Sequence, residues 1–489
     1  MTRSNQDSQQ LELHRRVCNL RASKGIEMNR RDFLSSAGFT LAATCLSAHR
    51  LGAEPAHATL ALNRANALAT VPEDYIGLSY ESAQLANPAF FSATNHALIA
   101  LFAELGTQGL LRIGGGTSEF TAFTRERLST PAPFDTVGPD TSKSVKSDTP
   151  ITPVGIENLR SFLEATGWRC LYGLNLGRGK VERAVDEADC VQQILGDKLI
   201  AFQIGNEPDA WRTRYRPDTF TYADYWKEWS AAHQAILARV PNARFAGPDI
   251  SNKMPYITGF AQNVQQSGVK IEMLTSHYYA MGPAGSPGMT IEKLLSPDAK
   301  IEREMKITLA AARSINVPYR MCEGNSCWNG GQEGVSDTFA SALWAADVML
   351  HFASLGCAGM NMHGGGNGFY TPIAGSLKQG FTRRPEFFGM QMMREFAGAK
   401  LIECKLDGAH ALARAHVAKR KGALLLFVSN PASEPLMVQT PLRHAHTQWM
   451  LKAASLDARE NIVFAKGKAT ALRKGLLQVP PCSAVLVRS

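Results

Sequence analysis

The feature that most constrains the fold of this chain is a series of eight short apolar segments, rich in Ile, Leu, Val, Tyr and Phe. They recur roughly every 40 residues from Tyr75 onward, at 76–81, 109–115, 170–175, 199–207, 243–250, 271–279, 317–325 and 357–365. Stretches with the 3.6-residue period of amphipathic helices lie between them, as at 222–240, 301–315 and 338–355. Eight alternations of strand and helix predict an α/β fold, a (β/α)8 TIM barrel.

Most of the predicted strands end in side chains that can do chemistry. The strand ends carry Glu81, Asn175, Asn206, Glu207, Asp249, His277, Glu323 and His363. The carboxyl ends of the strands meet at one mouth of such a barrel, where its active sites lie. Their convergence indicates an enzyme.

The pattern changes after about residue 386 to short alternating strands, at 423–429, 437–440, 447–453 and 483–487. This predicts a C-terminal β-sandwich over residues 386–489, with residues 59–71 adding a strand to it and residues 72–385 forming the barrel. The longest connection, residues 117–150, follows the second strand and is a candidate wall for a cleft.

The pattern of the first 58 residues predicts an N-terminal extension followed by an export signal. Two arginines, Arg30 and Arg31, precede a weakly apolar run at 35–48, and Ala56-His57-Ala58 fits a signal-peptidase site. This arrangement resembles a twin-arginine signal, for which Met28 is a natural start. The apolar run is too short to span a bilayer, and Thr44 before Cys45 does not fit a lipid-anchor motif. We expect an exported protein, periplasmic or secreted, without stable membrane anchoring.

Charge and cysteine content exclude two other classes of protein. The net charge is +9, of which residues 1–58 supply three with eight Lys/Arg and five Asp/Glu, so the remaining surplus is mild and does not favour nucleic-acid binding. Seven cysteines follow the leader without a C-x-x-C pair, at 170, 190, 322, 327, 357, 404 and 482. Their odd number and irregular spacing argue against a disulfide framework or a zinc ribbon.

Two of the strand-ending carboxylates suggest a reaction. Glu207 closes the fourth strand within Gly-Asn-Glu-Pro, and Glu323 closes the seventh within Glu-Gly-Asn-Ser. Strands three apart face each other across an eight-stranded barrel. Retaining glycosidases use two carboxyl groups about 5–5.5 Å apart, one as acid/base and one as nucleophile. We therefore assign Glu207 as acid/base and Glu323 as nucleophile.

Several motifs narrow this assignment. They are Leu111-Arg-Ile-Gly-Gly-Gly-Thr117, Tyr172-Gly-Leu-Asn175, Ile204-Gly-Asn-Glu-Pro208, Ser276-His-Tyr-Tyr279, Glu323-Gly-Asn-Ser326, Ser336-Asp-Thr-Phe-Ala340 and Gly368-Phe-Tyr370. In this order the chain resembles the heparanase and β-glucuronidase family, glycoside hydrolase family 79. The resemblance covers most of the chain after the leader and implies β-linked uronic acid glycosides as substrates.

Further site residues follow from the same motifs. Asn206 is placed to bind the 2-hydroxyl of the sugar, a contact that strengthens in the transition state. One of Tyr278 and Tyr279 is expected to donate to the nucleophile, with Tyr279 favoured. The resemblance implies that Glu81 binds sugar hydroxyls, although a surface carboxylate is an equal reading of the same residue.

The resemblance also implies a uronate pocket after strands seven and eight. Gly368 and Tyr370 occupy the positions that bind the sugar carboxylate in the family. Trp328 departs from the pattern, because heparanase-type members carry a tyrosine there. A tryptophan can stack on a sugar face and offers an indole N–H, yet it lacks the hydroxyl.

The sequence thus predicts a β-glucuronidase-like retaining hydrolase, with exo-action favoured by the long connection at 117–150. Two alternatives stay open: a same-clan glycosidase for a neutral or methylated sugar, and a non-catalytic polysaccharide-binding protein on this scaffold. The expected partner is a carbohydrate, and no feature predicts an oligomeric state. No cofactor is expected, and His277, His351 and His363 lack metal-ligand spacing.

Overall fold

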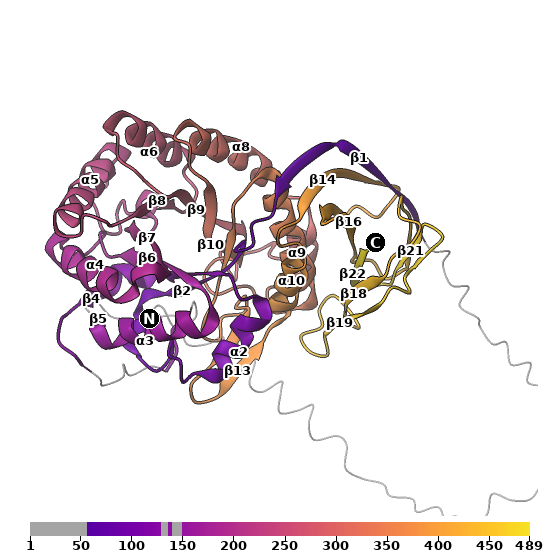
Figure 1. Ribbon diagram of the computed structural model, residues 1–489, viewed down its shortest axis with the longest axis horizontal. Helices are drawn as coiled ribbons and strands as arrows, with labels where there is room; N and C mark the ends of the chain where they lie inside the picture. The colour runs from indigo at the N-terminus through magenta and orange to yellow at the C-terminus, as the bar shows by residue number, and fades with distance from the viewer. Residues whose placement is uncertain (1–55, 129–134, 139–148) are drawn as a thin grey trace, which may run out of the picture. The chain divides into compact units, whose positions relative to one another are not determined.

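The structure is a computed structural model that describes residues 56–128, 135–138 and 149–489 (Figure 1). Eight parallel strands close into a barrel in which the last pairs with the first. They are β2 (Ile76–Glu81), β3 (Leu110–Gly114), β6 (Arg169–Leu174), β7 (Leu199–Ile204), β8 (Phe245–Ile250), β9 (Met273–Met281), β10 (Tyr319–Cys327) and β11 (Met360–His363). Each overlaps one of the eight predicted segments, which confirms the predicted barrel.

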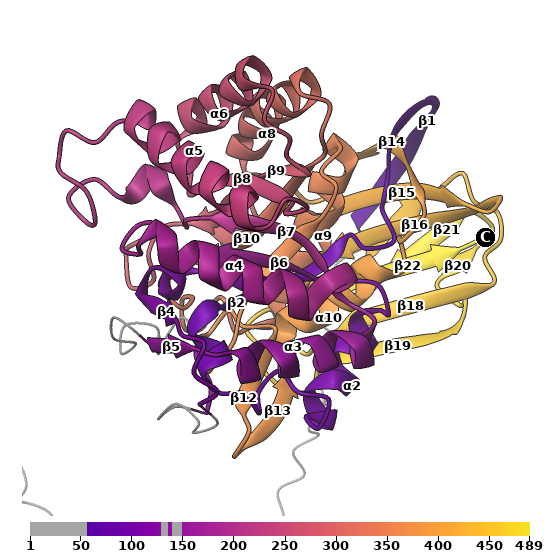
Figure 2. The same cartoon turned by 60° about the vertical axis from the view of Figure 1, so that its left-hand side comes forward.

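A layer of helices surrounds the barrel (Figure 2). It comprises α2 (His96–Leu105), α3 (Pro153–Thr166), α4 (Val181–Leu195), α5 (Tyr222–Arg239), α6 (Met254–Ser267), the short α7 (Ile291–Leu295), α8 (Ala299–Ser314), α9 (Phe339–Leu355) and α10 (Pro385–Arg394). Helix α5 shows how the sequence specifies them. The side chains of Thr221 and Asp224 each accept a backbone N–H of the other, which closes a capping box at its start. Its buried residues Tyr225, Trp229 and Ile236 recur at helical spacing.

The barrel ends later than the predicted boundary at residue 386. Helix α10 follows β11 as the helix of the eighth β/α unit, and the C-terminal domain begins with β14 (Lys400–Asp407). Gly389 allows α10 to pack closely on α9, because a Cβ at this position would lie 2.2 Å from the carbonyl oxygen of Ala342. The residues directly after 386 therefore form a helix packed on the barrel, and the strands of the C-terminal domain begin only at Lys400.

The C-terminal domain is a curled sheet of ten strands in the order β19-β18-β22-β16-β15-β14-β1-β17-β21-β20. Besides β14, they are β1 (Ala56–Thr70), β15 (Arg414–Arg420), β16 (Ala423–Asn430), β17 (Leu436–Gln439), β18 (Thr447–Lys452), β19 (Val463–Lys468), β20 (Leu472–Arg473), β21 (Leu476–Val479) and β22 (Ser483–Arg488). Strand β1 runs antiparallel to β14 and parallel to β17, so a segment from before the barrel lies inside the C-terminal sheet.

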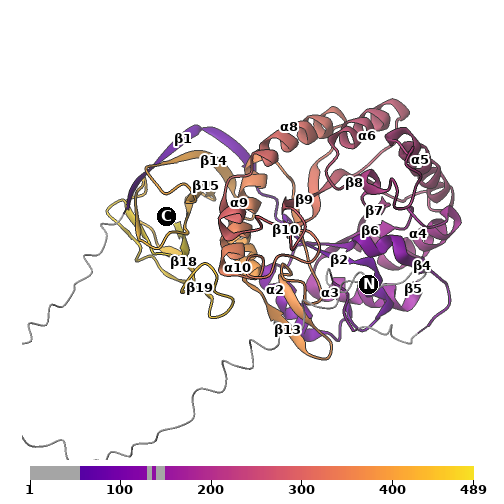
Figure 3. The same cartoon turned by 180° about the vertical axis from the view of Figure 1, so that it is seen from behind.

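Helix α9 joins the two domains (Figure 3). The backbone N–H groups of Phe339 and Ala340, at its first residues, donate to the carbonyl oxygens of Ala458 and Leu456 in the C-terminal domain. Because α9 contacts the barrel on one side and the sheet on the other, most of its residues are buried. The C-terminal domain therefore supports the helix between β10 and β11, the strands that carry Glu323 and His363.

The predicted export signal lies mainly outside the described residues. Its proposed cleavage site, Ala56-His57-Ala58, is described and forms the start of β1, where these residues pair with Leu436–Val438 of β17. A cleavage after Ala58 would remove this pairing.

The long connection after β3 begins with a 3-10 helix, η2 (Gly116–Phe120), and a short strand, β4 (Thr121–Phe123). It ends with β5 (Thr149–Ile151), which pairs with β4. In the part of the chain between β4 and β5, the backbone N–H of Val137 donates to Oε1 of Gln84 after β2. Gly138 packs on the backbone of Gly365 after β11 so closely that a Cβ would lie 2.1 Å from its carbonyl oxygen. Residues 135–138 thus lie against two loops at the carboxyl-end mouth of the barrel.

Candidate active site

Polar side chains from seven barrel strands meet at the carboxyl-end mouth. They are Glu81 (β2), Arg112 (β3), Asn206 and Glu207 (after β7), Asp249 (β8), His277 and Tyr279 (β9), Glu323 (β10) and His363 (β11). The fully buried guanidinium of Arg112 connects them. It donates to Oε2 of Glu323 at 2.5 Å, to Oδ1 of Asn206 at 2.7 Å and to Oδ2 of Asp249 at 2.6 Å. Residues far apart in the sequence therefore form one site.

Glu207 has the more open position of the two predicted catalytic residues. It follows β7 in the left-handed backbone region, with φ 49°, and its N–H donates to the carbonyl oxygen of Asp249. A non-glycine residue in this region is uncommon and marks sites where the surroundings impose the backbone conformation. The side chain is 23% exposed, and its Oε1 lies 3.0 Å from Nδ1 of His277.

Glu323 is buried and held at both oxygens. Its Oε1 accepts a hydrogen bond of 2.9 Å from the hydroxyl of Tyr279, while its Oε2 accepts the hydrogen bond from Arg112. Burial raises the pKa of this carboxyl, but the positive charges of His363, His277 and Arg112 outweigh burial and hold the pKa well below its usual range. The carboxylate is ionised and oriented at neutral pH.

The two carboxylates lie close together. One oxygen of Glu207, one oxygen of Glu323 and one nitrogen of His277 all lie within 4.8 Å of one another. Carboxyl groups with oxygens this near to each other suit retaining glycosidases, in which the two groups are roughly 5–5.5 Å apart, better than inverting ones, in which they are roughly 6.5–9.5 Å apart.

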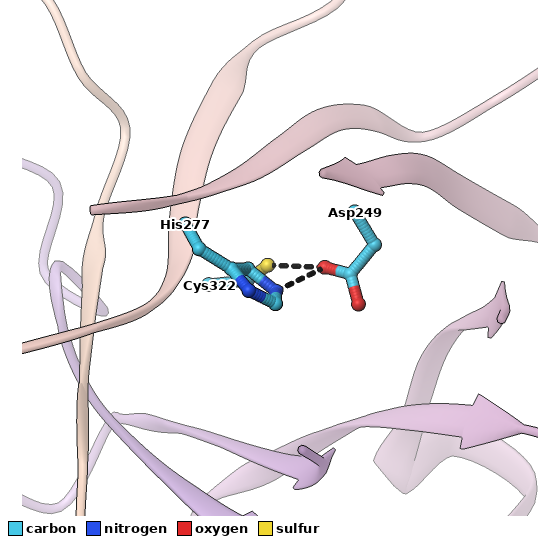
Figure 4. A group of neighbouring side chains, drawn as sticks. All are labelled: Asp249, His277 and Cys322. Carbon is cyan, nitrogen blue, oxygen red and sulfur yellow. Dashed lines mark hydrogen bonds and ion pairs between the residues drawn. The ribbon is translucent and has the colours of Figure 1, made fainter. Parts of the chain in front are cut away.

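Behind this pair lies a buried group formed by Asp249, His277 and Cys322 (Figure 4). Oδ1 of Asp249 is 3.2 Å from Nε2 of His277 and accepts a hydrogen bond from the Cys322 thiol. Burial lowers the pKa of His277, but Glu323 and Asp249 act more strongly and raise it well above its usual value. A charged imidazole thus faces both glutamates, with Nδ1 3.0 Å from Glu207 and 3.8 Å from Glu323.

Residues of the kinds that bind metals gather here, but their charge states do not suit a metal ion. Metal ligands must be deprotonated, whereas the raised pKa of His277 keeps its imidazole protonated. Burial raises the pKa of the Cys322 thiol, so a thiolate is disfavoured. Arg112 neutralises Asp249 from the other side. The donor set fits a network of ion pairs and hydrogen bonds.

Glu81 lies on the floor of the site. Its Oε2 accepts hydrogen bonds from the N–H and hydroxyl of Thr117, and its Oε1 is 3.4 Å from Nε2 of His363. Both oxygens therefore have protein partners, and only 3% of the residue is exposed. The surface carboxylate considered from the sequence is excluded by this burial.

Asn206 is oriented by two neighbours. Arg112 binds its side-chain oxygen, so the amide nitrogen is the part of the side chain that is available to a ligand. Its backbone N–H donates at 2.8 Å to Oε1 of Glu119, a fully buried residue of η2 whose Oε2 also accepts the N–H of Gly177. Burial raises the pKa of Glu119 to about 7, against the lowering effect of these N–H groups. Glu119 thus links the loops after β3, β6 and β7.

The two consecutive tyrosines of β9 point to different partners. The Tyr279 hydroxyl donates to Glu323, whereas the Tyr278 hydroxyl donates at 3.0 Å to Asp298, the residue before α8. The ring of Tyr370 lies 6.2 Å from that of Tyr279, so the residue predicted to bind a uronate carboxylate is next to the donor of the nucleophile.

The loops after β10 and β11 carry the other predicted pocket residues. Trp328 directly follows β10 and is 44% exposed. Gly368 is buried, and its carbonyl oxygen accepts the N–H of Thr371. The amide nitrogen of Asn325 donates to the carbonyl oxygens of His363 and Tyr370, which fixes one loop against the other.

Sequence reasoning missed the roles of Arg112, Glu119 and the Asp249–His277 pair. Arg112 stands in the middle of an apolar strand motif, and a charged residue at such a position was the available signal. Asp249 and His277 were recognised as strand-ending polar residues without a role. Glu119 follows a glycine run in a loop, and nothing in its local pattern distinguishes it from a solvated carboxylate.

No family model matches the chain. A β-glucuronidase of Aspergillus niger is 27% identical over 343 residues, which are 61% of this chain and 61% of the relative. A β-glucuronidase of Neurospora crassa is 29% identical over 319 residues, which are 58% of this chain and 55% of the relative. A heparanase of Gallus gallus is 21% identical over 449 residues, 78% of this chain and 82% of the relative. The matches span less than two thirds of the fungal relatives' own length. They confirm the resemblance to the heparanase and β-glucuronidase family.

Solved structures show the same fold. A 4-O-α-L-rhamnosyl-β-D-glucuronidase from Fusarium oxysporum 12S has a TM-score of 0.69 at 17% identity over 88% of this chain and 99% of that chain. A GH51 arabinofuranosidase from Xanthomonas axonopodis pv. citri has a TM-score of 0.64 at 13% identity, over 89% of this chain and 99% of that chain. These likenesses confirm the predicted barrel with a C-terminal β-sandwich.

None of the helices in the described part of the chain combines the length and the apolar character that crossing a membrane requires.

Replacing Arg112 with methionine tests the electrostatic account of the site. Arg112→Met removes the buried cation that binds both Glu323 and Asp249 and leaves His277 as their shared positive neighbour, so we expect the free energy of unfolding to fall by about 3–5 kcal/mol. Urea unfolding measures this. The difference in stability from the wild type should narrow as the pH falls below neutral. Arg112 helps to hold the pKa values of both carboxyls low in the wild type, so in the variant they take up protons at higher pH, which relieves the unpaired charge. The control is Arg303→Met on α8, whose side chain is 64% exposed. Equal stability of the two variants would contradict the account.

Proposed function

We propose that this relative of heparanases and β-glucuronidases is a retaining glycoside hydrolase for β-linked uronic acid glycosides. One observation carries the proposal: two carboxylates within 4.8 Å of each other, one buried and held by Arg112 and Tyr279, the other partly exposed. A nucleophile must be ionised and aimed, while an acid/base must exchange protons with a leaving group and with water. Glu323 suits the first role and Glu207 the second.

In the first step, an oxygen of Glu323 attacks the anomeric carbon of the sugar. The bond from that carbon to the glycosidic oxygen breaks, and Glu207 gives its proton to this oxygen, so the leaving group departs as an alcohol. The negative charge that forms on Glu207 develops 3.0 Å from Nδ1 of the positively charged His277. The product is a glycosyl ester of Glu323.

In the second step, the carboxylate of Glu207 takes a proton from a water molecule. The water oxygen attacks the anomeric carbon, and the ester bond breaks to return Glu323 as a carboxylate. Arg112 and Tyr279 stabilise this leaving carboxylate with the same hydrogen bonds that oriented it for attack. The sugar is released with its original anomeric configuration.

The proposed uronate pocket is formed by the loops after β10 and β11. Tyr370 lies beside Tyr279, and Gly368 is in the same short loop. The names of the fungal relatives support a glucuronide substrate. Exposed Trp328 favours a second candidate, a glycoside of a neutral or methylated sugar that stacks on the indole.

Residues 135–138 favour exo-action within this proposal. They lie against the loops after β2 and β11, and such a wall closes one end of a cleft.

Export by the twin-arginine route is also part of the proposal. The cysteines at 170, 190, 322, 327, 357, 404 and 482 are all free thiols, as suits a protein that folds in a reducing compartment.

A substrate panel tests the function. The full chain should hydrolyse an aryl β-glucuronide faster than the matched β-glucoside, β-xyloside, β-galactoside and glucuronide methyl ester, as followed by release of the phenol. The Glu323→Gln variant should lose turnover by several orders of magnitude and still fold. Hydrolysis of a neutral glycoside with no activity on the glucuronide would reject the uronate substrate. Activity of Glu323→Gln near that of the wild type would reject the nucleophile.

The acid/base assignment predicts a dependence on the leaving group. In Glu207→Ala, we expect kcat/KM, which reports the first step, to fall about 10²–10⁴-fold for a phenyl glucuronide, which needs protonation, and far less for a dinitrophenyl glucuronide, which does not. Azide, which needs no general base, should restore turnover and yield a β-glycosyl azide. Glu302→Ala, on the exposed face of α8, serves as the control. An equal loss on both substrates without azide rescue would count against Glu207.

A further inference from the structure

A buried carboxyl group that the proposed reaction does not use lies close to the loops after β10 and β11. Glu386 is the second residue of α10, and only 1% of it is exposed. Its hydrogen-bond partner is the neutral side chain of Asn325 rather than a cation. Burial raises the pKa of this carboxyl well above its usual value, although the hydrogen bond from Asn325 acts in the opposite direction.

Asn325 connects this carboxyl to two further segments. It lies in β10, two residues after Glu323, and is itself 1% exposed. Its amide nitrogen is 3.1 and 3.0 Å from the two carboxyl oxygens of Glu386, 3.0 Å from the carbonyl oxygen of His363 and 3.2 Å from that of Tyr370. The two hydrogens of one amide are thus shared by acceptors on β11, on the loop after β11 and on α10.

The loop that carries Tyr370 is held from two sides. After this loop, at 364–372, come a hairpin of β12 (Ile373–Ser376) and β13 (Gly380–Arg383) and then α10, whose Glu386 binds the same amide as the loop. On the side of β10, a Cβ at Gly331 would lie 2.6 Å from the backbone nitrogen of Tyr370. The loop therefore lies between the segment after β10 and the start of α10.

Two groups of the proposed active site depend on this arrangement. Tyr370 lies beside Tyr279, the donor to Glu323, and Tyr279 is paired with Asn325 in the register of β9 and β10. The imidazole of His363 lies 3.9 Å from Oε2 of Glu323. Burial raises the pKa of Glu323, and the charge of His363 is the strongest of those that lower it. A shift of the Asn325 amide would therefore move a residue of the uronate pocket and a neighbour of the nucleophile.

Packing alone does not explain a carboxyl group at this position. Burying a polar group costs free energy that its hydrogen bonds return only in part, and an apolar side chain of similar size can fill the same space. Glu386 offers instead two acceptor oxygens that hold the Asn325 amide in one orientation. The other end of the amide is held as well, because its oxygen accepts the N–H and the hydroxyl of Ser326.

We infer that Glu386 is a positioning residue, which orients Asn325 and through it places the loop of Tyr370 to bind the carboxylate of the sugar. Glu386 acts through Asn325 and not on the substrate itself. This inference rests on the proposed function, because it concerns the uronate pocket of that reaction. Contacts that fix a binding loop before the ligand arrives reduce the entropy lost on binding. Loss of such a contact weakens uronate binding in a protein that still folds.

Three substitutions of Glu386 in the full chain test this inference. Glu386→Gln keeps the length and an acceptor oxygen, so KM for an aryl β-glucuronide should stay within about twofold of the wild type. Glu386→Leu removes both acceptors and should raise KM, and the inhibition constant of glucuronic acid, about tenfold. Glu386→Asp keeps the carboxyl but not its reach and should raise both about threefold. In Glu386→Leu, the preference in kcat/KM for the glucuronide over its methyl ester should fall as well.

Met393→Ala controls for a loss of stability alone. Met393 is buried at the other end of α10, beside the start of β2, and its truncation leaves a cavity far from the Asn325 contacts. This variant should lower the midpoint of thermal unfolding. When activity is measured well below that midpoint, its KM and its preference for the glucuronide should equal those of the wild type.

A double-mutant cycle tests whether the effect passes through Asn325. Asn325→Ala should raise KM at least as much as Glu386→Leu does. The variant with both changes should be no worse than Asn325→Ala, because the two substitutions break the same link. Additive effects on KM would show that Glu386 acts by another route and would overturn the inference.

The remaining outcomes separate this inference from the function on which it rests. A folded Glu386→Leu with the constants of the wild type, or an equal loss in Glu386→Gln, would reject the positioning role and leave the hydrolase intact. If Glu386→Leu does not fold, equal constants in Glu386→Asp and Glu386→Gln would reject it. Failure of the wild type to hydrolyse any glucuronide would reject both.

Discussion

The buried guanidinium of Arg112 is the interaction on which the rest of the site depends. It lies inside the barrel with almost no exposure and binds Glu323, Asn206 and Asp249 from three other strands. A cation in such surroundings is tolerated because carboxylates satisfy its charge, and those carboxylates are tolerated because of the cation. Together with the charges of His363 and His277, Arg112 keeps Glu323 ionised, and its contact with Asn206 orients that side chain beside Glu207. Stability and chemical competence of the site therefore share one origin.

The surroundings of the two glutamates make them unequal. Glu323 has a hydrogen-bond donor at each oxygen and little exposure, whereas Glu207 itself has a left-handed backbone conformation and remains partly exposed. His277 lies between them with a positive charge that Asp249 and Glu323 maintain. The asymmetry extends outward, since half-buried Tyr279 of β9 and buried Tyr370 of the loop after β11 lie together beside Glu323.

Periodicity and motif order predicted the barrel, its eight strands and the placement of Glu207 and Glu323 at strand ends, because strand alternation and chain order determine these directly. They predicted less well what depends on three-dimensional packing. The role of α10 became clear only from its contact through Gly389, and a local pattern cannot distinguish a packed helix after a strand from the start of a new domain. Glu119 and Arg112 acquire their roles from partners about 60 to 210 residues away, a distance that no local signal spans.

The central claim, that Glu323 forms a covalent bond with the sugar, has a direct test. The full chain is incubated with a 2-deoxy-2-fluoro-β-glucuronyl fluoride, which reacts in the first step but is slow in the second, and is then digested and analysed by mass spectrometry. Our account predicts one added fluoroglucuronyl group per chain, located on Glu323 and lost slowly as the enzyme regains activity. A stable label on Glu207 or Glu81, or hydrolysis of glucuronides with inversion and no labelled intermediate, would contradict it.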